Sequence, residues 1–279
     1  MKEIKIGDRT IGQHESAFII AEVGINHNGS IQQAKKLIDE AKKSGASSVK
    51  FQTYITEKRV QKDAPIFDIL KQCEISFEDQ EKLFKYAKEI GLVAFSTPFD
   101  EESVNFLSEI NVPLLKVASF DIVNKPLLEN ISKTNTPVII SRGMASEAEL
   151  DRAHKIFNER SIPHAILHCI SAYPIKNLDS INMSTLSYLK ERYDGIVGFS
   201  DHTIGSAASI CAVTMGAKII EKHFTLDKKD DGPDHIMSAD PDEMKEMIFG
   251  IRNVETMIGK PVKEPIPEEQ DILQYRRNN

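Results

Sequence analysis

A short apolar, β-branched run recurs eight times along the chain, and helical patterns stand between successive runs. Continuous apolar character indicates strands that are buried on both faces, as in a parallel sheet. Eight β-then-α units predict a (β/α)8 barrel of the α/β class, with an open doubly wound sheet as the structural alternative. The runs are Phe18–Val23, Ser48–Gln52, Leu92–Ser96, Leu114–Val117, Val138–Ser141, Ala165–Cys169, Ile196–Phe199 and Lys218–Phe224.

Capping signals mark where several of the intervening helices begin. Ser30 with Gln33 predicts a capping box, in which the Gln33 side chain reaches back to the cap residue, and Ser146 with Glu149 predicts another. The run Asp240-Pro241-Asp242-Glu243 is expected to cap the last helix, and Gly259 to end it. Each of these helices follows one of the apolar runs, as the repeat requires.

Two segments lie outside the repeat. Ile4–Ile6 and Thr10–Gly12 predict a small hairpin around Gly7-Asp8 that covers the bottom of the barrel. Residues 261–279 contain several prolines and indicate a linker or tail. We therefore expect one barrel domain over residues 1–260, followed by this tail.

Composition excludes several classes of protein. Lys and Arg total 35 against 42 Asp and Glu, a net charge of -7, which argues against nonspecific binding of nucleic acid. The three cysteines are far apart and predict neither a disulfide framework nor a metal-binding pair. The first residues lack the pattern of a signal peptide, and no apolar run is long enough to span a membrane. The cytoplasm is the expected compartment, with no membrane partner.

Every predicted strand ends in polar residues, and the active site of a (β/α)8 barrel lies at the carboxyl ends of its strands. Two connections that follow strands, 54–76 and 225–239, are also long, and long loops in compact domains are usually functional. The polar residues, grouped by strand, are Glu22; Lys50 and Gln52; Thr97; Lys116, Ser119 and Asp121; Ser141; Ser171 and Tyr173; Ser200 and His202; and Glu221, His223 and Asp234.

Lys50 and Lys116 point to an anionic ligand. Burying a lysine without a partner is costly, so each must be compensated. A compact phosphate or carboxylate would do this, aided by the hydroxyls of Ser119, Ser141 and Ser200. The alternative is a pair of internal ion pairs, for example to Glu22 and Asp121.

His202 and His223 stand at the ends of adjacent strands, so both imidazoles can reach one point. Two neutral imidazoles are a plausible start for a divalent metal site. Water or substrate would complete its coordination sphere, as a catalytic Lewis acid requires. The alternative is a histidine pair that is hydrogen-bonded to Asp201 and Glu221.

Seven blocks of sequence sharpen these predictions: Ile20–Gly29, Val49–Thr53, Ser96–Phe99, Leu115–Ser119, Gly198–Thr203, Glu221–Phe224 and Gly232–His235. In this order they resemble the sialic acid synthase family, and they span almost the whole chain. Members of that family condense phosphoenolpyruvate with an N-acylated amino sugar to make nonulosonic acids. The resemblance also favours the barrel over the open sheet.

Roles for individual residues follow from the resemblance alone. Glu22 would face the reacting centre, as a group that transfers a proton or orients a hydroxyl. His202 and His223 would bind a divalent metal ion, Mn²⁺ or Mg²⁺. The residues implied to hold phosphoenolpyruvate are Lys50, Lys116, Ser119, Ser141 and Ser200, with Thr97 nearby. Those implied to contact the sugar are Gln52, Asp121, Tyr173 and Asp234, together with the position of Ser171.

The sequence departs from the bacterial sialic acid synthases at two of these positions. Asp121 stands where they carry Glu, and Ser171 where they carry Asn. The run Ser171–Pro174 is more similar to the pseudaminic acid and spore-coat branches, whereas Gly232–His235 resembles the sialic and legionaminic branches. The sugar therefore stays open between N-acetylmannosamine and the substrates of these related branches.

The resemblance implies partners as well. Family members usually continue into a small antifreeze-like domain that reaches across a homodimer and gives an arginine to the partner's sugar site. This sequence stops near that junction, so we expect either a truncated chain or a naturally short member of the family. In both cases the resemblance implies that this arginine is missing, and a homodimer and a separate antifreeze-like domain are the partners to test. Two functions other than the synthase are an aldolase with Lys50 or Lys116 as a Schiff-base nucleophile, and a sugar-binding homologue without activity.

Overall fold

The computed structural model describes residues 3–7, 9–260 and 264–277. Eight parallel strands close into a barrel in the order β10-β3-β4-β5-β6-β7-β8-β9, so the predicted (β/α)8 fold is confirmed and the open sheet is wrong. The strands are β3 (Phe18–Gly24), β4 (Ser48–Thr53), β5 (Val93–Pro98), β6 (Leu115–Val117), β7 (Val138–Ser141), β8 (His164–Cys169), β9 (Ile196–Asp201) and β10 (Ile219–His223).

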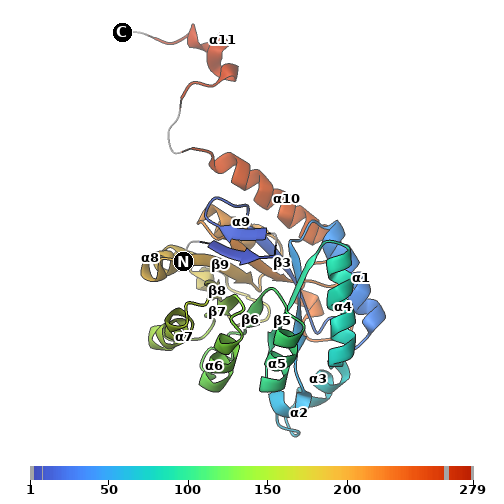
Figure 1. Ribbon diagram of the computed structural model, residues 1–279. Helices are drawn as coiled ribbons and strands as arrows, with labels where there is room; N and C mark the ends of the chain where they lie inside the picture. Colours follow the sequence, from blue (N-terminus) through green and yellow to red (C-terminus); the bar gives the residue numbers. More distant parts are fainter. Residues whose placement is uncertain (1–2, 8, 261–263, 278–279) are drawn as a thin grey trace.

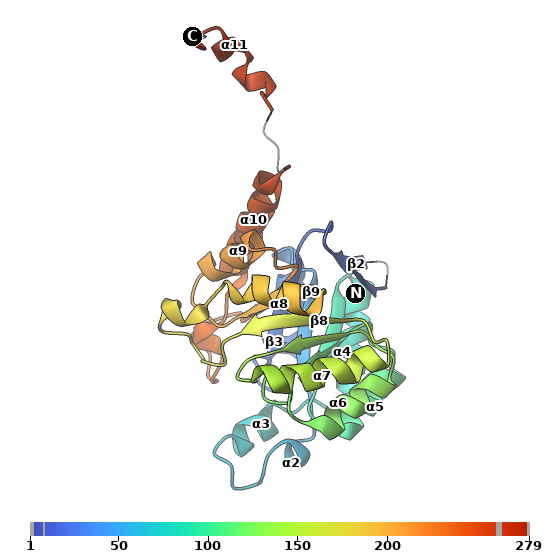
Figure 2. The same ribbon diagram turned by 90° about the vertical axis from the view of Figure 1, so that its left-hand side faces the viewer.

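Helices form the outer ring of the barrel (Figures 1 and 2). The α-helices are α1 (Ile31–Lys43), α2 (Thr56–Arg59), α3 (Phe67–Cys73), α4 (Phe77–Glu89), α5 (Glu101–Glu109), α6 (Lys125–Lys133), α7 (Glu147–Glu159), α8 (Thr185–Tyr193), α9 (Ala207–Thr214), α10 (Pro241–Ile258) and α11 (Gln270–Leu273). Short 3-10 helices are η1 (Leu178–Ile181), η2 (His235–Met237) and η3 (Pro267–Glu269). The connection 54–76 is therefore not a plain loop, because it contains α2 and α3.

Two of the three predicted helix caps are confirmed in full. Capping boxes form at Ser146 before α7 and at Asp240 before α10. Before α1, the Ser30 hydroxyl accepts from the backbone N–H of Gln33, but the reciprocal bond is absent. The Gln33 amide instead donates to Asp230 Oδ2 at 3.1 Å, since a charged carboxylate is the stronger acceptor. This contact ties α1 to the connection 225–239.

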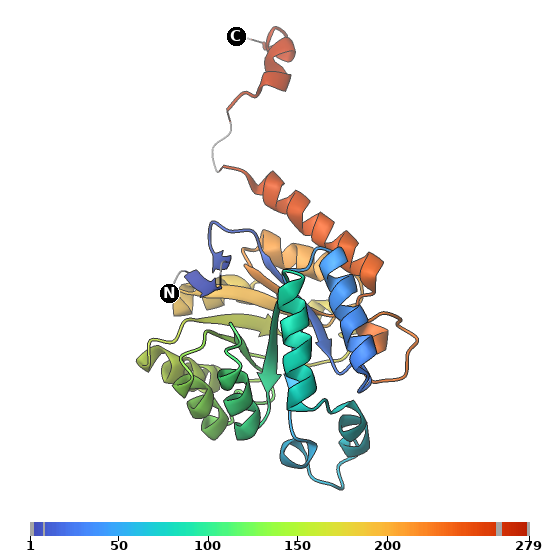
Figure 3. The ribbon, with the colours of Figure 1, turned by 45° about the vertical axis from the view of Figure 1, so that its right-hand side comes forward.

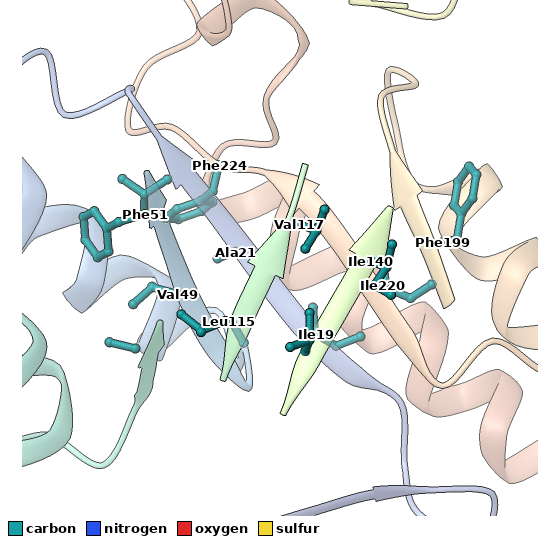
Figure 4. Close-up of a cluster of buried hydrophobic side chains, with 14 of the residues drawn as sticks. Ile19, Ala21, Val49, Phe51, Leu115, Val117, Ile140, Phe199, Ile220 and Phe224 are labelled. Atoms are coloured by element: carbon teal, nitrogen blue, oxygen red, sulfur yellow. The ribbon is translucent and has the colours of Figure 1, made fainter. Parts of the chain in front are cut away.

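Side chains alternate along each strand between the helical ring and the barrel interior. In β3, Ile19 and Ala21 face outward into the large apolar cluster under the helices, where Phe51 and Phe224 also lie (Figure 4). Phe18 and Ile20 face inward and belong to a second buried cluster. A fully buried side chain of this size contributes roughly 1.5–3 kcal/mol, so both clusters hold the barrel together.

An N-terminal hairpin closes one end of the barrel, as predicted. Strands β1 (Glu3–Ile6) and β2 (Arg9–Gly12) pair antiparallel, and Ile4 lies opposite Ile11. The side chains of Ile4 and Ile11 are fully buried and belong to the cluster of inward-facing residues. Asp8 of the predicted turn lies outside the described residues. The hairpin and the α2–α3 segment lie at opposite ends of the barrel (Figure 3).

The end of the chain differs in detail from the tail expected at 261–279. Residues 264–277 include η3 and α11, which lie apart from the barrel in Figures 1 and 2. Residues 261–263 and 278–279 of that tail lie outside the described residues. Among the helices that the structure describes, none combines the length and apolar character needed to cross a membrane.

Candidate active site

A cavity of about 360 Å³ opens at the carboxyl ends of the strands, within the range of small-molecule sites. Twelve of the fourteen predicted site residues line it: Glu22, Lys50, Gln52, Thr97, Lys116, Ser119, Ser141, Tyr173, Ser200, His202, His223 and Asp234. The other two lie just outside. Ser171 Oγ is 3.0 Å from Ser119 Oγ, and the Asp121 carboxylate accepts from Asn124 at 3.3 Å.

Two lysines and two glutamates form a buried cluster at the base of the cavity, which we call the lysine–carboxylate cluster (Lys50, Lys116, Glu22 and Glu221). Lys50 Nζ lies 2.7 Å from Glu22 Oε2 and 3.8 Å from Glu221 Oε2. It also donates to Thr97 Oγ1 at 3.0 Å. These residues come from four strands, β10, β3, β4 and β5, that lie side by side in the barrel.

Lys116 completes the cluster from the other side. Its Nζ donates to Ser141 Oγ at 2.7 Å and lies 3.8 Å from Glu221 Oε1. Ser200 Oγ donates to the same Oε1 at 3.0 Å. The ion-pair alternative raised by the sequence is therefore correct for both lysines, although the partner of Lys116 is Glu221 and not Asp121. While both glutamates are ionised, no anionic ligand is needed to compensate the two lysines.

Burial shifts the pKa values of the cluster in opposite directions. Burial and the charge of Glu221 raise the pKa of Glu22 to about 7, against the opposing effect of Lys50. Burial acts in the same direction on Glu221, but Lys116 and Lys50 outweigh it and hold the pKa of Glu221 below its usual range. Near neutral pH the cluster can therefore hold two cations and one anion, with Glu22 protonated. That state has a net positive charge and suits an anion.

His202 and His223 both line the cavity, and their rings meet edge to face with centroids 5.5 Å apart. His202 Nδ1 lies 2.7 Å from the carbonyl oxygen of Ile170, which can only accept, so Nδ1 carries the proton and Nε2 the free lone pair. Burial and the charge of His223 lower the pKa of His202 to about 4. Burial and the charge of Lys50 lower the pKa of His223 to about 3. Both rings are neutral at pH 7, as metal ligands must be.

The donor atoms around the two imidazoles fit a metal ion with open positions. His223 Nδ1 is buried, has no hydrogen-bond partner among the residues that the structure describes, and lies 3.6 Å from Asp234 Oδ2. The alternative of a histidine pair bonded to Asp201 and Glu221 is wrong, because Asp201 accepts from Thr203, Ser209 and Lys222. Nowhere in the described ranges do three or more His, Cys, Asp or Glu side chains gather to hold a metal. Water or substrate would have to complete the sphere.

The outer part of the cavity carries groups that suit a sugar. The Tyr173 ring packs against the His202 ring, with centroids 4.2 Å apart. Gln52 Nε2 donates to Glu22 Oε1 at 3.4 Å, and Gln52 Oε1 accepts from Arg59 at 2.9 Å. Asp234 comes from the connection 225–239, and burial raises its pKa. The outer part therefore offers both donors and acceptors to hydroxyl groups.

Two charged residues of the cavity were not predicted to bind or react. Glu221 bridges the two lysines, and its position on the inner face beside His223 was the signal that could have identified it. Arg59 ends α2 and lines the cavity. Only the length of the connection 54–76 pointed toward it, since no sequence pattern fixes which loop residue turns inward.

A model described as the NeuB family matches residues 37–263. The chain belongs to this family. An uncharacterized protein of Methanocaldococcus jannaschii is 46% identical over 280 residues, covering 100% of this chain and 83% of that protein. N,N'-diacetyllegionaminic acid synthase of Legionella pneumophila is 40% identical over 285 residues, covering 95% of this chain and 80% of the relative.

Solved structures agree with the family. The N-acetylneuraminic acid (sialic acid) synthetase from Leptospira borgpetersenii, in complex with citrate, superposes with a TM-score of 0.93 at 37% identity. The match covers 99% of this chain and 96% of that one. Relatives of the chain include synthases of sialic, legionaminic and pseudaminic acids, so the resemblance seen in the sequence is confirmed.

Proposed function

We propose that this chain is a nonulosonic acid synthase that condenses phosphoenolpyruvate with an N-acylated amino sugar of the N-acetylmannosamine type. One observation carries the proposal: a single cavity combines the lysine–carboxylate cluster, three serine hydroxyls and two neutral imidazoles. The names of its relatives support the same class of product. Legionaminate, pseudaminate and spore-coat-type substrates are the closest alternatives.

Phosphoenolpyruvate would bind at the base of the cavity. With Glu22 protonated, Lys50 and Lys116 exceed the charge of Glu221 and attract the phosphate and carboxylate groups. The Ser141 hydroxyl accepts from Lys116 and keeps its own proton to donate, whereas Ser119 and Ser200 would exchange their present partners, Ser171 and Glu221, for the ligand. Preorganised charges in a site with little water are the largest single source of rate enhancement in many enzymes.

In the proposed reaction the methylene carbon of phosphoenolpyruvate bonds to the aldehyde carbon of the open-chain sugar. Glu22 begins protonated and gives its proton to the former aldehyde oxygen. Water then adds to the former enol carbon and returns a proton to Glu22. The new hydroxyl becomes the keto group as the C–O bond to phosphate breaks, and its proton leaves with the phosphate. A pKa near 7 suits a group that acts first as acid and then as base.

We further propose that His202 and His223 hold a divalent cation, Mn²⁺ or Mg²⁺. When bound, the ion would supply Lewis-acid polarisation of the sugar's carbonyl oxygen. The chain's own contribution is to fix the ligands. The carbonyl of Ile170 holds the His202 ring in one tautomer, leaving Nε2 free to bind.

An observation also favours the aldolase as a second candidate, because burial lowers the pKa of Lys116 and so makes its amine more available as a nucleophile. Treatment with borohydride in the presence of substrate would trap a covalent adduct on the aldolase. The synthase forms no such adduct.

The decisive test measures phosphate release from phosphoenolpyruvate with Mn²⁺ and a panel of N-acyl hexosamines. We expect release that depends on the sugar, disappears with a chelator and returns with Mn²⁺. His202→Gln should lower this rate about 100-fold, as expected for a ligand of a catalytic metal. The control is His154→Gln, because His154 lies outside the cavity and is hydrogen-bonded to His164.

Two outcomes would count against the proposal. No phosphate release with any sugar, with or without a separately added antifreeze-like domain and at concentrations that allow a homodimer, would reject the synthase. Full activity of His202→Gln in the presence of chelator would reject the metal.

A further inference from the structure

We propose that Arg59 is a built-in anchor for the acceptor sugar, binding one of its carbonyl or hydroxyl oxygens. This inference rests on the proposed function. Arg59 is the last residue of α2, and its side chain lines the same cavity as Gln52 and Asp234. It therefore reaches the outer, sugar side of the cavity from the connection 54–76.

Aromatic rings hold the guanidinium in place. Its central carbon lies 3.6 Å from the centroid of the Phe99 ring and 4.7 Å from that of Tyr54. The Tyr54 hydroxyl donates to the carbonyl of Leu70 at 2.9 Å, which fixes that ring in turn. Stacking covers the flat faces of a guanidinium and leaves its edges free, so the N–H donors stay available in one plane.

Most of those donors have no acceptor in the described part of the protein. A guanidinium has five N–H groups. Over residues 3–7, 9–260 and 264–277, the guanidinium of Arg59 donates one hydrogen bond, from Nη1 to Gln52 Oε1 at 2.9 Å, and no carboxylate lies within ion-pair distance of it. The preceding Lys58 is different, since it is exposed and forms an ion pair with Glu102. The guanidinium of Arg59 is partly buried and fixed in orientation, and most of its N–H groups have no acceptor among the described residues. A ligand oxygen could accept from them.

The surrounding charges indicate which chemistry Arg59 recognises. Asp121 and Asp234 act on Arg59 through space. Acidic groups near one cation leave little excess positive charge on this side, so an additional anion is poorly accommodated. A neutral sugar fits better, because carboxylates can accept from its hydroxyls while Arg59 donates to its N-acyl carbonyl or a hydroxyl oxygen. The anionic substrate has its own cations, Lys50 and Lys116, at the base.

The test separates the two substrates kinetically. Arg59→Met should raise the KM for N-acetylmannosamine roughly tenfold to hundredfold, as expected for charge-assisted hydrogen bonds to a neutral group. The KM for phosphoenolpyruvate and kcat should stay within about threefold, because the lost contact is made before and during reaction alike. Arg59→Lys should recover only part of the sugar affinity, since an ammonium lacks the planar fork. Lys58→Met is the matched control and should leave all three values unchanged.

Calorimetric titration of N-acetylmannosamine and of phosphoenolpyruvate into the Mn²⁺-loaded protein gives a readout that does not need turnover. Arg59→Met should weaken sugar binding and leave phosphoenolpyruvate binding unaltered. If the unsubstituted protein released no phosphate but Arg59→Met still weakened sugar binding, the synthase proposal would be rejected and the proposal that Arg59 binds the sugar would be supported.

Three results would overturn the anchor. One is a fall in kcat with unchanged sugar affinity, which would mean that Arg59 acts only by positioning Gln52 and, through it, Glu22. Another is a preference of the unsubstituted protein for the 6-phosphate of the sugar that disappears in Arg59→Met, which would assign Arg59 to an anionic group. The third is sugar binding by Arg59→Met that equals that of the Lys58→Met control.

Discussion

The two ends of this barrel are built from the same strands and have opposite chemistry. In β3, Ile20 faces the apolar end and Glu22, two residues later, faces the cavity. In β10, Ile219 and Glu221 repeat this change. A shift of two residues keeps a side chain on the inner face of a strand and moves it along the barrel axis. One inner surface is therefore divided into an apolar end that stabilises the fold and a charged end that can do chemistry.

The contrast shows why the charged end can be tolerated. Buried ion pairs such as Lys50–Glu22 contribute little net stability, because the cost of removing charges from water offsets their attraction. The apolar end and the outer cluster supply the favourable burial instead. Substitutions at the charged end should therefore affect activity more than stability, and substitutions at the apolar end should do the reverse.

The largest expected effect is the loss of activity in Lys116→Met. Methionine preserves much of the length and removes the charge, so phosphate release should fall by roughly 10³, the cost of removing a preorganised charge from the reacting centre. The variant should stay folded, because Glu221 keeps Lys50 as a neighbour at 3.8 Å. Steady-state phosphate release and circular dichroism measure the two effects.

Lys218→Met is the control for this substitution. Lys218 directly precedes β10 at the opposite end of the barrel and donates to the backbone carbonyl of Glu15. Its loss should leave turnover unchanged. Equal losses of activity in the two variants would show that turnover depends on the overall charge of the protein and not on the position of Lys116 in the cavity.

A smaller effect, of opposite kind, is expected for Ile11→Ala in the hairpin. Ile11 is fully buried against the apolar end, so its truncation should lower the free energy of unfolding by roughly 3 kcal/mol. Denaturant unfolding measures this, and the folded variant should keep its kcat. Lys5→Ala, an exposed change on the same hairpin, should cost almost nothing. A large fall in kcat for Ile11→Ala would mean that the two ends are coupled.

The fold could be predicted from sequence because every strand obeys the same rule. Runs such as Val138–Ile140 are apolar throughout, so each had to be buried on both faces, and eight of them close a barrel. Parallel strands also deliver their last residues to one end of the barrel. That is why most of the predicted site residues line one cavity although they are spread from Glu22 to Asp234.

What could not be predicted depends on pairing between side chains. Glu22 is the predicted partner of Lys50, but Lys116 pairs with Glu221 in place of Asp121. Glu221 also lies near Lys50, and only barrel closure makes its strand β10 a neighbour of β3. Arg59 lies in a connection with no strand periodicity, so its direction depends on packing against Phe99 and Tyr54. The pairing of these side chains and the direction of Arg59 depend on tertiary contacts, so no local sequence pattern predicts them.

The smallest expected effect is a difference between Glu22 and Glu221 in how each contributes to the free energy of unfolding as the pH changes. The pKa of Glu22 is about 7 in the folded protein and 4.5 for an ordinary glutamate, so the folded state keeps its proton to higher pH. The contribution of Glu22 to stability is therefore complete below pH 4.5 and is lost as the pH rises through 7. The loss between pH 5 and 7 should be roughly 2 kcal/mol, at about 1.4 kcal/mol for each pH unit.

Glu22→Gln removes this titration, so the difference in unfolding free energy between the variant and the unsubstituted protein isolates Glu22 from all other groups. Measured in urea without metal or ligand, that difference should move in favour of the variant as the pH rises from 5 to 7. Glu221→Gln should show the opposite trend, and at lower pH, between about 2 and 5. The pKa of Glu221 is lowered by Lys116 and Lys50, so its charge stabilises the fold above about pH 4.5, and its loss should destabilise the protein most at neutral pH. If both variants moved in the same direction, the two glutamates would share one role, and the base of the cavity would lack the single proton that the proposed reaction needs.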